Sequence, residues 1–105
     1  MASPQLQNGH TRIAHDILEA IAKSNMSAMQ LKAIIWILRL TYGFQRTEMT
    51  TNVNAFATKL KSTGKYIKQI FSELEHFSVI TVEWASADLC KIKFNKDFDK
   101  WKCFL

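Results

Sequence analysis

The chain has 105 residues, of which 48% are hydrophobic and 22% are charged, so its length and composition predict one globular domain with a modest core. Fourteen lysines and arginines against nine acidic residues give a formal net charge of +5, which favours an anionic partner such as nucleic acid without proving one. The two cysteines, Cys90 and Cys103, form no CxxC pattern and have no histidine at metal-ligand spacing, which predicts free thiols in a reducing compartment.

The sequence predicts neither a signal peptide nor a membrane-spanning helix. The opening residues, MASPQLQNGHTR, lack the apolar region of a signal peptide. The most apolar run, AIIWIL at residues 33–38, is too short to cross a bilayer. We therefore expect a cytoplasmic protein without a membrane partner.

The first predicted elements are a polar arm and a helix. Residues 1–10 contain Pro4 and Asn8-Gly9 and are expected to form a flexible N-terminal arm, whereas residues 11–105 are expected to form a single domain. Apolar side chains at helical spacing predict a helix over residues 12–23, which Thr11 would cap. Its apolar face consists of Ile13, Ala14, Ile17, Leu18 and Ile21.

A capping-box pattern, Ser27 to Gln30, predicts the start of a second helix over residues 28–41, with Gly43 as a left-handed residue after its end. This helix is apolar almost all round. One stripe is made of Leu31, Ile34, Ile35 and Leu38, and a nearly opposite one of Met29, Ala33, Trp36 and Leu40. Such a helix is either central in its fold or carries a partner surface, and the central position is favoured.

The second half of the chain predicts short, closely spaced elements. We expect a short strand at residues 49–51, a helix over residues 55–60 capped by Asn54, and a tight turn at residues 62–64. Thr63 would cap a fourth helix that ends near Phe77. Two β-rich runs, at residues 79–84 and 89–94, are joined by the polar link ASAD and predict a hairpin. In the tail, Phe98 and Trp101 are expected to pack back onto the domain.

This order of elements predicts a winged helix-turn-helix, a mainly α fold with a small β-hairpin (α+β). About three residues join the third and fourth helices, which is the spacing of a helix-turn-helix. The hairpin that directly follows the second helix of that pair would be the wing.

The fourth helix carries the main functional prediction. Projection at 100° per residue places Ile67, Ile70, Phe71, Leu74 and Phe77 on one side. The opposite side is basic and amide-bearing in its first two turns, with its acidic residues, Glu73 and Glu75, coming later; this side consists of Lys65, Lys68, Gln69 and Ser72, extended by His76 and bordered by Tyr66. In a helix-turn-helix this part of the helix meets the major groove, where glutamine can bond an adenine edge and lysine a phosphate.

Residues outside this helix extend the predicted DNA-binding set. Lys59 and Lys61 would lie over the flanking phosphates, Lys91 and Lys93 alternate on one face of the hairpin, and Arg46 could join from the loop. For any single lysine, a solvated surface is the commoner explanation, but the group on one predicted helix favours contact with double-stranded DNA. The complete set is Lys59, Lys61, Thr63, Lys65, Tyr66, Lys68, Gln69, Ser72, Lys91 and Lys93.

Four segments resemble a known family. NGHTRIAHDILEAI at residues 8–21, LKAIIWILRLTYGF at residues 31–44, SELEHFSVI at residues 72–80 and NKDFDKW at residues 95–101 are similar to the N-terminal domain of the phage replication protein O family, the lambda-type replication initiators. The resemblance spans residues 8–101, and its most specific parts are NGHTRI and TYGF.

The resemblance implies a winged-helix domain that binds repeated sites in a phage replication origin, commonly as a dimer. It makes Met29, Trp36 and Leu40 the candidates for a dimer interface, and it leaves a replication or regulatory protein open as a further partner. The initiators continue beyond the point that matches Leu105, so we expect either an excised domain or a stand-alone DNA-binding protein, in the host cytoplasm if a phage encodes it.

Enzyme, metal and cofactor functions receive no support. His10, His15 and His76 have no carboxylate or cysteine at ligand spacing, and the three glycines form no phosphate-binding loop. We expect no catalytic residues, no metal site and no cofactor. In the family that the chain resembles, a separate C-terminal region recruits the host's helicase-loading machinery. The alternatives to an origin-binding domain are a transcriptional regulator or competitor that lacks this region, and a protein-interaction winged helix. For the latter, Trp84, Trp101 and Phe104 would be anchors if exposed, although such residues more often belong to the core.

Overall fold

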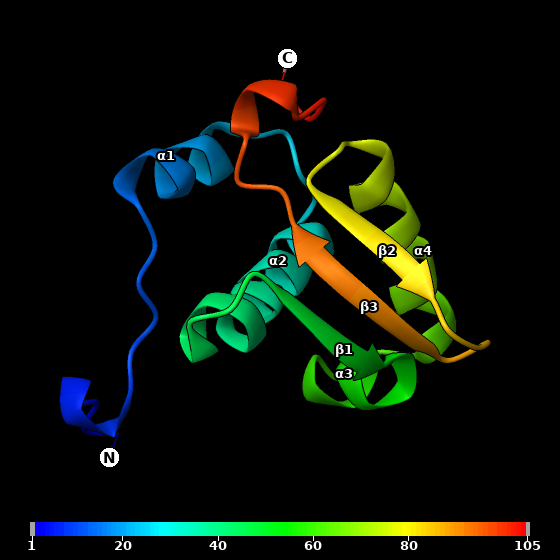
Figure 1. The fold of residues 1–105 in the computed structure, drawn as a ribbon, viewed down its shortest axis with the longest axis horizontal. Coiled ribbons are helices and arrows are strands. Elements are labelled where there is room, and N and C mark those ends of the chain that lie inside the picture. Colours follow the sequence, from blue (N-terminus) through cyan, green and yellow to red (C-terminus); the bar gives the residue numbers. More distant parts are fainter. Residues whose placement is uncertain (1, 105) are drawn as a thin grey trace.

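The computed structural model describes residues 2–104, and in that range four α-helices and one antiparallel sheet form an α+β fold, as predicted (Figure 1). The elements are α1 (His15–Lys23), α2 (Ala28–Thr41), β1 (Glu48–Asn52), α3 (Val53–Lys59), α4 (Gly64–His76), β2 (Ile80–Trp84) and β3 (Leu89–Phe94). Short 3-10 turns lie at Leu6–Asn8, Tyr42–Phe44 and Phe98–Lys100. The division into a flexible arm and a single domain stays a prediction.

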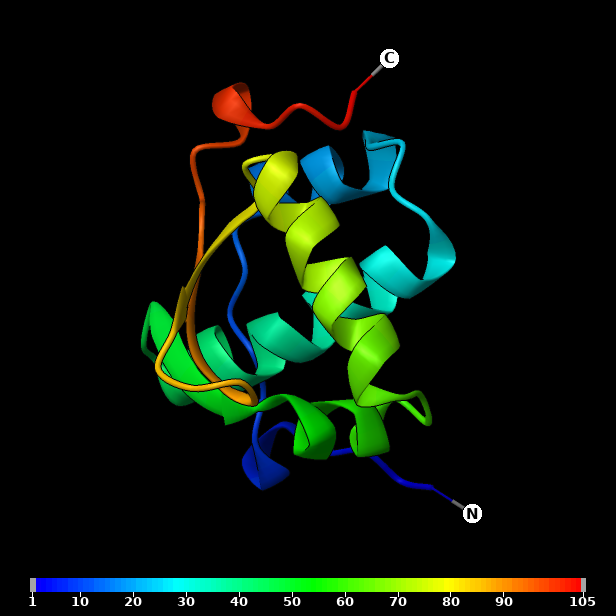
Figure 2. The ribbon, with the colours of Figure 1, turned by 90° about the vertical axis from the view of Figure 1, so that its right-hand side faces the viewer.

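The sheet contains one strand more than the hairpin. Its order is β1-β3-β2, so β3 is central and pairs antiparallel with both neighbours. Along β3, Cys90, Ile92 and Phe94 are buried, whereas Lys91 and Lys93 are exposed. The buried side chains meet the helices, and the other face of the sheet is open to solvent (Figure 2). The hairpin prediction is confirmed, and the strand expected at residues 49–51 is β1.

The second helix is central, as predicted. Ala33, Ile34 and Ile37 are completely buried, and the capping box is present, with Ser27 N–H donating to Gln30 Oε1 at 2.8 Å and Gln30 N–H to Ser27 Oγ at 3.3 Å. The stripe prediction is wrong for Ile35, which is 62% exposed. This helix is covered around most but not all of its circumference, and Ile35 lies on the uncovered side.

Two predicted helix starts are wrong. The first helix begins at His15, Ala14 is its N-cap without a side-chain hydrogen bond, and Leu18 is exposed, because this short helix buries only the narrow strip that includes Ile17 and Ala20. In the third helix Asn52, not Asn54, is the cap: Asn52 Oδ1 accepts from Asn54 N–H at 2.9 Å and Ala55 N–H at 3.2 Å. The helix therefore starts directly at the end of β1.

The chain also leaves α2 differently from the prediction. Tyr42–Phe44 continues α2 as a 3-10 turn, and Gln45, with φ 57°, is the left-handed residue. Gly43 is instead a point of close approach, since a Cβ there would lie 3.0 Å from Arg39 Nη1 and 3.1 Å from Thr11 Oγ1. The segment before α1 therefore packs against the end of α2.

The tail packs onto the domain, as predicted. Trp101 is buried, its Nε1–H donates to the Asn95 carbonyl at 2.8 Å, and its ring meets Phe94 edge-to-face with centroids 5.6 Å apart. Phe98 is half-buried beside it. Trp84 and Phe104 are not core residues, because they are 46% and 41% exposed. Within residues 2–104 no helix is long and apolar enough to cross a membrane.

Candidate nucleic-acid interface

The third and fourth helices form a tight helical pair. Phe56 of α3 and Phe71 of α4 pack edge-to-face with centroids 4.9 Å apart, and four residues, 60–63, join the helices. Thr63 caps α4 as predicted, its Oγ1 accepting from Tyr66 N–H at 3.2 Å. Lys61 takes a left-handed conformation in the turn, with φ 56°. The pair thus has the short connection that a helix-turn-helix requires.

The predicted polar side of α4 faces solvent. Ile67, Ile70, Phe71 and Leu74 are buried on the opposite side, which is why the helix orients this way. The exposed side is not covered by the tail, and Figure 2 shows α4 at the front of the molecule along its whole length. It carries Lys65, Tyr66, Gln69, Ser72 and His76, with Lys68 half-buried at its border.

The tip of the hairpin, residues 85–88, lies beside the first two turns of α4. Lys68 Nζ is 3.1 Å from Asp88 Oδ1 and 5.9 Å from the centroid of the Trp84 ring. The Asp88 carbonyl also accepts from Val53 N–H at 2.8 Å, which ties the tip to the start of α3. A wing-like loop is therefore held next to the candidate recognition helix, but its sequence, ASAD, contains an acid and no base.

Two predicted site residues lie elsewhere. Lys91 and Lys93 are on the solvent face of β3, the central strand, whereas α4 packs against the other face. Lys91 pairs with Glu83 at 3.5 Å. The structure does not bring these two lysines together with α4, because the alternation that exposes them also directs them away from the helices.

Acidic side chains contact the polar side of α4. Glu73 accepts from Gln69 Nε2 at 3.2 Å and from the buried Gln30 Nε2 at 2.9 Å, so it holds the amide of the candidate base-reading residue. On the other flank, Glu75 Oε2 accepts from Val82 N–H at 3.0 Å. The sequence alone places Glu73 and Glu75 on α4. Asp88, in contrast, is twenty residues from Lys68 in the chain and lies close to it only because of the hairpin.

Three further predicted residues lie near the N-terminal end of α4. Lys59 ends α3, Lys61 is in the turn and Lys65 is in the first turn of α4, and all three are exposed. Within residues 2–104 none of these three lysines forms an ion pair. We call these three lysines, together with Thr63, Tyr66, Lys68, Gln69 and Ser72, the α4 surface.

The dimer candidates on α2 are less accessible than predicted. Met29, Trp36 and Leu40 are half-buried and pack against the core. Ile35 is the large apolar side chain that α2 exposes most, at 62%. A dimer interface through Met29, Trp36 and Leu40 stays a prediction.

The two cysteines lie in the interior of the domain. Both cysteines are free and buried, and burial raises the pKa of the Cys90 thiol to about 11. In the part of the chain that the structure describes, no three His, Cys, Asp or Glu side chains are grouped as metal ligands.

These features define a small α+β domain with a solvent-facing basic helix after a short turn and a hairpin beside it. A family model described as bacteriophage replication protein O matches residues 3–101, nearly the whole chain. The chain therefore belongs to the bacteriophage replication protein O family, as the resemblance predicted, and has a role in phage replication. Comparison with curated proteins and with solved structures gave no match.

Proposed function

We propose that the chain is a double-stranded DNA-binding winged-helix domain that recognises a phage replication origin. The observation that carries the proposal is the α4 surface: a basic helix face, uncovered by the protein, on a chain of a phage replication family. We also propose that it acts in the host cytoplasm, where phage DNA is replicated.

The arrangement suits insertion of α4 into a major groove. Its first turns project Lys65 and Gln69, and its free N-terminal N–H groups favour the negative phosphates. Lys59 and Lys61 would contact the backbone beside the groove, and Gln69 could bond the N6 and N7 atoms of an adenine. The lysines supply salt-sensitive affinity, whereas Gln69 and Ser72 supply the contacts to base edges.

Binding requires two side chains to exchange partners. Gln69 must leave Glu73, and Lys68 must leave Asp88, before either reaches a duplex. Both contacts are on the exposed or half-exposed surface, where such pairs contribute little stability, so a phosphate or base edge can replace them. The hairpin tip would then approach the backbone next to the groove.

The proposal is tested by removing the polar groups of the recognition helix together. The triple variant Lys65→Ala, Lys68→Ala, Gln69→Ala should bind duplex DNA at least about tenfold more weakly, and loss of two phosphate contacts should reduce the salt slope by about 1.8. Lys23→Ala with Lys102→Ala removes the same charge from exposed positions outside the α4 surface and should change neither quantity. Unchanged duplex affinity of the triple variant would show that α4 is not the recognition helix.

A second candidate function is docking of a protein partner. The exposed Trp84 beside α4 favours it, because exposed aromatic residues are frequent anchors of interfaces. Selection of duplexes from random sequence at two salt concentrations separates the candidates. Enrichment of a repeated motif supports origin recognition or transcriptional regulation, whereas absence of duplex binding even at low salt supports docking of a protein.

A further inference from the structure

A second basic surface lies at the C-terminal end of α2, which we call the α2-end surface. Its cations come from four separate parts of the chain: the segment before α1, the last turn of α2, the loop after it, and the end of β3 with the residues that follow. They are Arg12, Arg39, Arg46, Lys93 and Lys96. Within the described residues none of the five forms an ion pair, whereas Lys68, Lys91 and Lys100 do.

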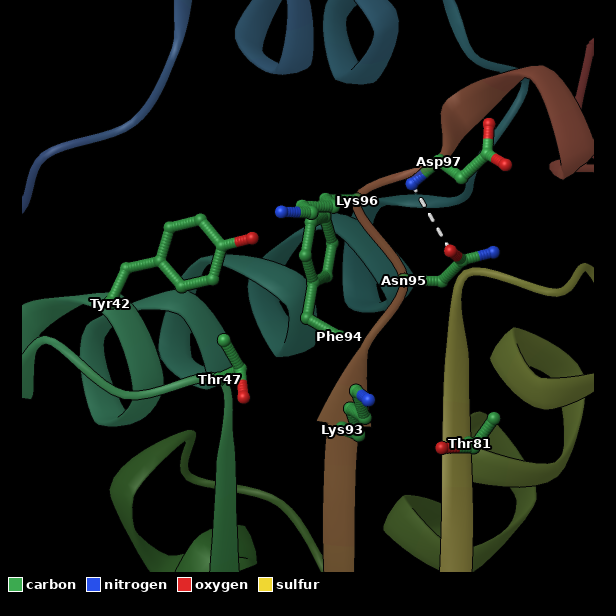
Figure 3. A pocket seen from close by; sticks show the side chains of 8 residues that line it. All are labelled: Tyr42, Thr47, Thr81, Lys93, Phe94, Asn95, Lys96 and Asp97. Carbon is green, nitrogen blue, oxygen red and sulfur yellow. Dashed lines mark hydrogen bonds between the residues drawn. The ribbon is translucent and has the colours of Figure 1, made fainter.

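One part of this surface is a pocket of about 470 Å³ at the end of the sheet (Figure 3). Lys93 and Lys96 line it, and Figure 3 shows the Tyr42 hydroxyl and the Lys96 amino group pointing toward one another beside the Phe94 ring. The pocket also contains Asp97, but its carboxylate lies 3.6 Å from Lys100 Nζ. The pocket thus combines amino and hydroxyl groups with an aromatic wall.

Two further hollows continue the surface. One, of about 390 Å³, shares Tyr42, Thr47 and Lys96 with the pocket and adds Arg12 and Arg46. The other, of about 420 Å³, is lined by Arg39 and Phe44. The first hollow shares residues with the pocket, and the second is lined by residues next to these at the end of α2. The pocket and the two hollows therefore form one path around the end of α2.

An exposed aromatic ring lies on this path beside two guanidinium groups. Phe44 is 56% exposed, and Cζ of Arg39 and Cζ of Arg46 lie 5.0 Å and 5.1 Å from its ring centroid. The Arg46 side chain is fixed further by its Nε–H, which donates to the Leu40 carbonyl at 3.1 Å. Phe44 and the two arginines therefore form a pre-arranged platform.

Attraction to the carbonyl end of α2 explains only part of this charge. A helix C-terminus favours cations near its free carbonyl groups, which accounts for Arg39 in the last turn and for Arg46, whose Nε–H donates to the Leu40 carbonyl. It does not account for Lys93 and Lys96, which come from the sheet and the chain after it, nor for a large aromatic ring left in water. Cations with exposed aromatic rings along hollows are the combination that binds a single nucleic-acid strand.

This surface is separate from the α4 surface. Gln30, near the start of α2, bonds to Glu73 of α4. Arg39 lies about 14 Å further along the α2 axis at a rise of about 1.5 Å per residue, and Phe44 lies beyond it. Figure 1 shows the C-terminal end of α2 on the opposite side of the molecule from α4.

We propose that the α2-end surface binds single-stranded DNA independently of duplex binding by α4. The phosphates would follow the five cations of the α2-end surface, and a base would stack on the platform of Phe44. A duplex fits less well, because the cations line hollows. One domain would then hold a single strand and a duplex at opposite ends.

The test measures the anisotropy of a labelled oligothymidine, about 15 nucleotides long, with the 105-residue chain. The double variant Arg39→Gln, Arg46→Gln should bind the single strand about tenfold more weakly, and its salt slope should fall by about 1.4. Phe44→Leu keeps the apolar bulk but removes the ring, and about tenfold weaker binding is expected from lost stacking. Lys23→Gln with Lys102→Gln is the charge-matched control, and thermal unfolding by circular dichroism verifies that every variant is folded.

Duplex binding measured in parallel decides between the outcomes. Loss of single-strand binding with duplex affinity retained supports the proposal. Absence of single-strand binding by the wild type, or unchanged binding by both variants, overturns it. Equal loss of single-strand and duplex binding also overturns it, since the surface would then belong to the duplex site. The Lys65, Lys68, Gln69 triple variant tests duplex recognition separately, so failure of one proposal leaves the other standing.

Discussion

Lys68 of α4 and Asp88 of the hairpin tip form an ion pair, with Nζ and Oδ1 3.1 Å apart, that joins the candidate recognition helix to the loop beside it. Both side chains are about half exposed, so the pair contributes little to stability. Its main consequence is electrostatic: a carboxylate lies where a phosphate of the duplex would approach.

Asp88→Asn should therefore strengthen duplex binding. The substitution removes one negative charge and frees Lys68 for a phosphate, while the backbone bond from Val53 N–H to the Asp88 carbonyl remains. We expect several-fold tighter binding and a salt slope larger by about 0.9, measured by anisotropy over a range of salt concentrations.

Glu83→Gln provides the matched control for Asp88→Asn. Glu83 also pairs with a lysine, Lys91, at 3.5 Å, but on the solvent face of the sheet away from α4. Its loss should leave duplex affinity unchanged. An equal gain from both variants would show that overall charge, and not the position of Asp88, governs binding.

Gly64 sets how closely α4 approaches α3, and so the orientation of the α4 surface. A Cβ on Gly64 would collide with Asn54 Oδ1 in the first turn of α3. Gly64→Ala should therefore destabilise the domain by about 1 kcal/mol, the lower end of the range for overpacking, because the exposed Asn54 side chain can rotate away from the new methyl group. Urea unfolding of Gly64→Ala, Asn54→Ala and the double variant gives the coupling. The double variant should recover most of the loss, and strict additivity of the two changes would contradict the close approach.

Local patterns in the sequence predicted most of the fold. The capping box of Ser27 and Gln30, the cap at Thr63 and the alternation along β3 are all short-range signals, and each is present in the structure. The errors arise where tertiary contacts decide. Asn52 caps α3 because β1 leads directly into the helix, and residues 12–14 stay outside α1.

The candidate site was harder to predict because its neighbours are distant in sequence. Helical projection identified the exposed face of α4, but no local pattern relates Lys68 to Asp88 or Gln30 to Glu73. Pairing of β1 with β3 makes β3 the central strand. It also places Lys93 next to residues of β1 on the solvent face of the sheet. The α2-end surface depends on the same sheet and was therefore missed as a unit.

The buried thiol of Cys90 should make stability fall at high pH. Burial raises the pKa of Cys90 from its ordinary value of 9.0 to about 11, so above pH 9 the unfolded chain releases a proton that the folded chain retains. The contribution to stability is complete below pH 9 and is lost as the pH rises through 11. Urea unfolding of the wild type at pH 7.5 and 10.5 should show this loss.

Cys90→Ala separates the thiol from other groups that titrate in the same range. Burial also raises the pKa of Cys103 and of Tyr42, so part of the pH dependence should persist in the variant. The decrease in unfolding free energy between the two pH values should nevertheless be smaller in Cys90→Ala than in the wild type. An equal decrease would show that Cys90 ionises normally in the folded protein.

We propose that the chain forms a homodimer through the uncovered side of α2, and the structure changes which residue tests this. Leu40 is half-buried against the core, so Leu40→Glu would damage the fold as well as an interface. Ile35, at 62% exposure, can be changed without opening the core.

Light scattering should give twice the chain mass of 12.1 kDa for the wild type and the single mass for Ile35→Glu. Leu18→Glu changes another exposed apolar residue, on α1, and should remain dimeric. A monomeric wild type, or a dimer that survives Ile35→Glu, would exclude this interface, because a buried unpaired carboxylate is costly at the centre of an apolar contact.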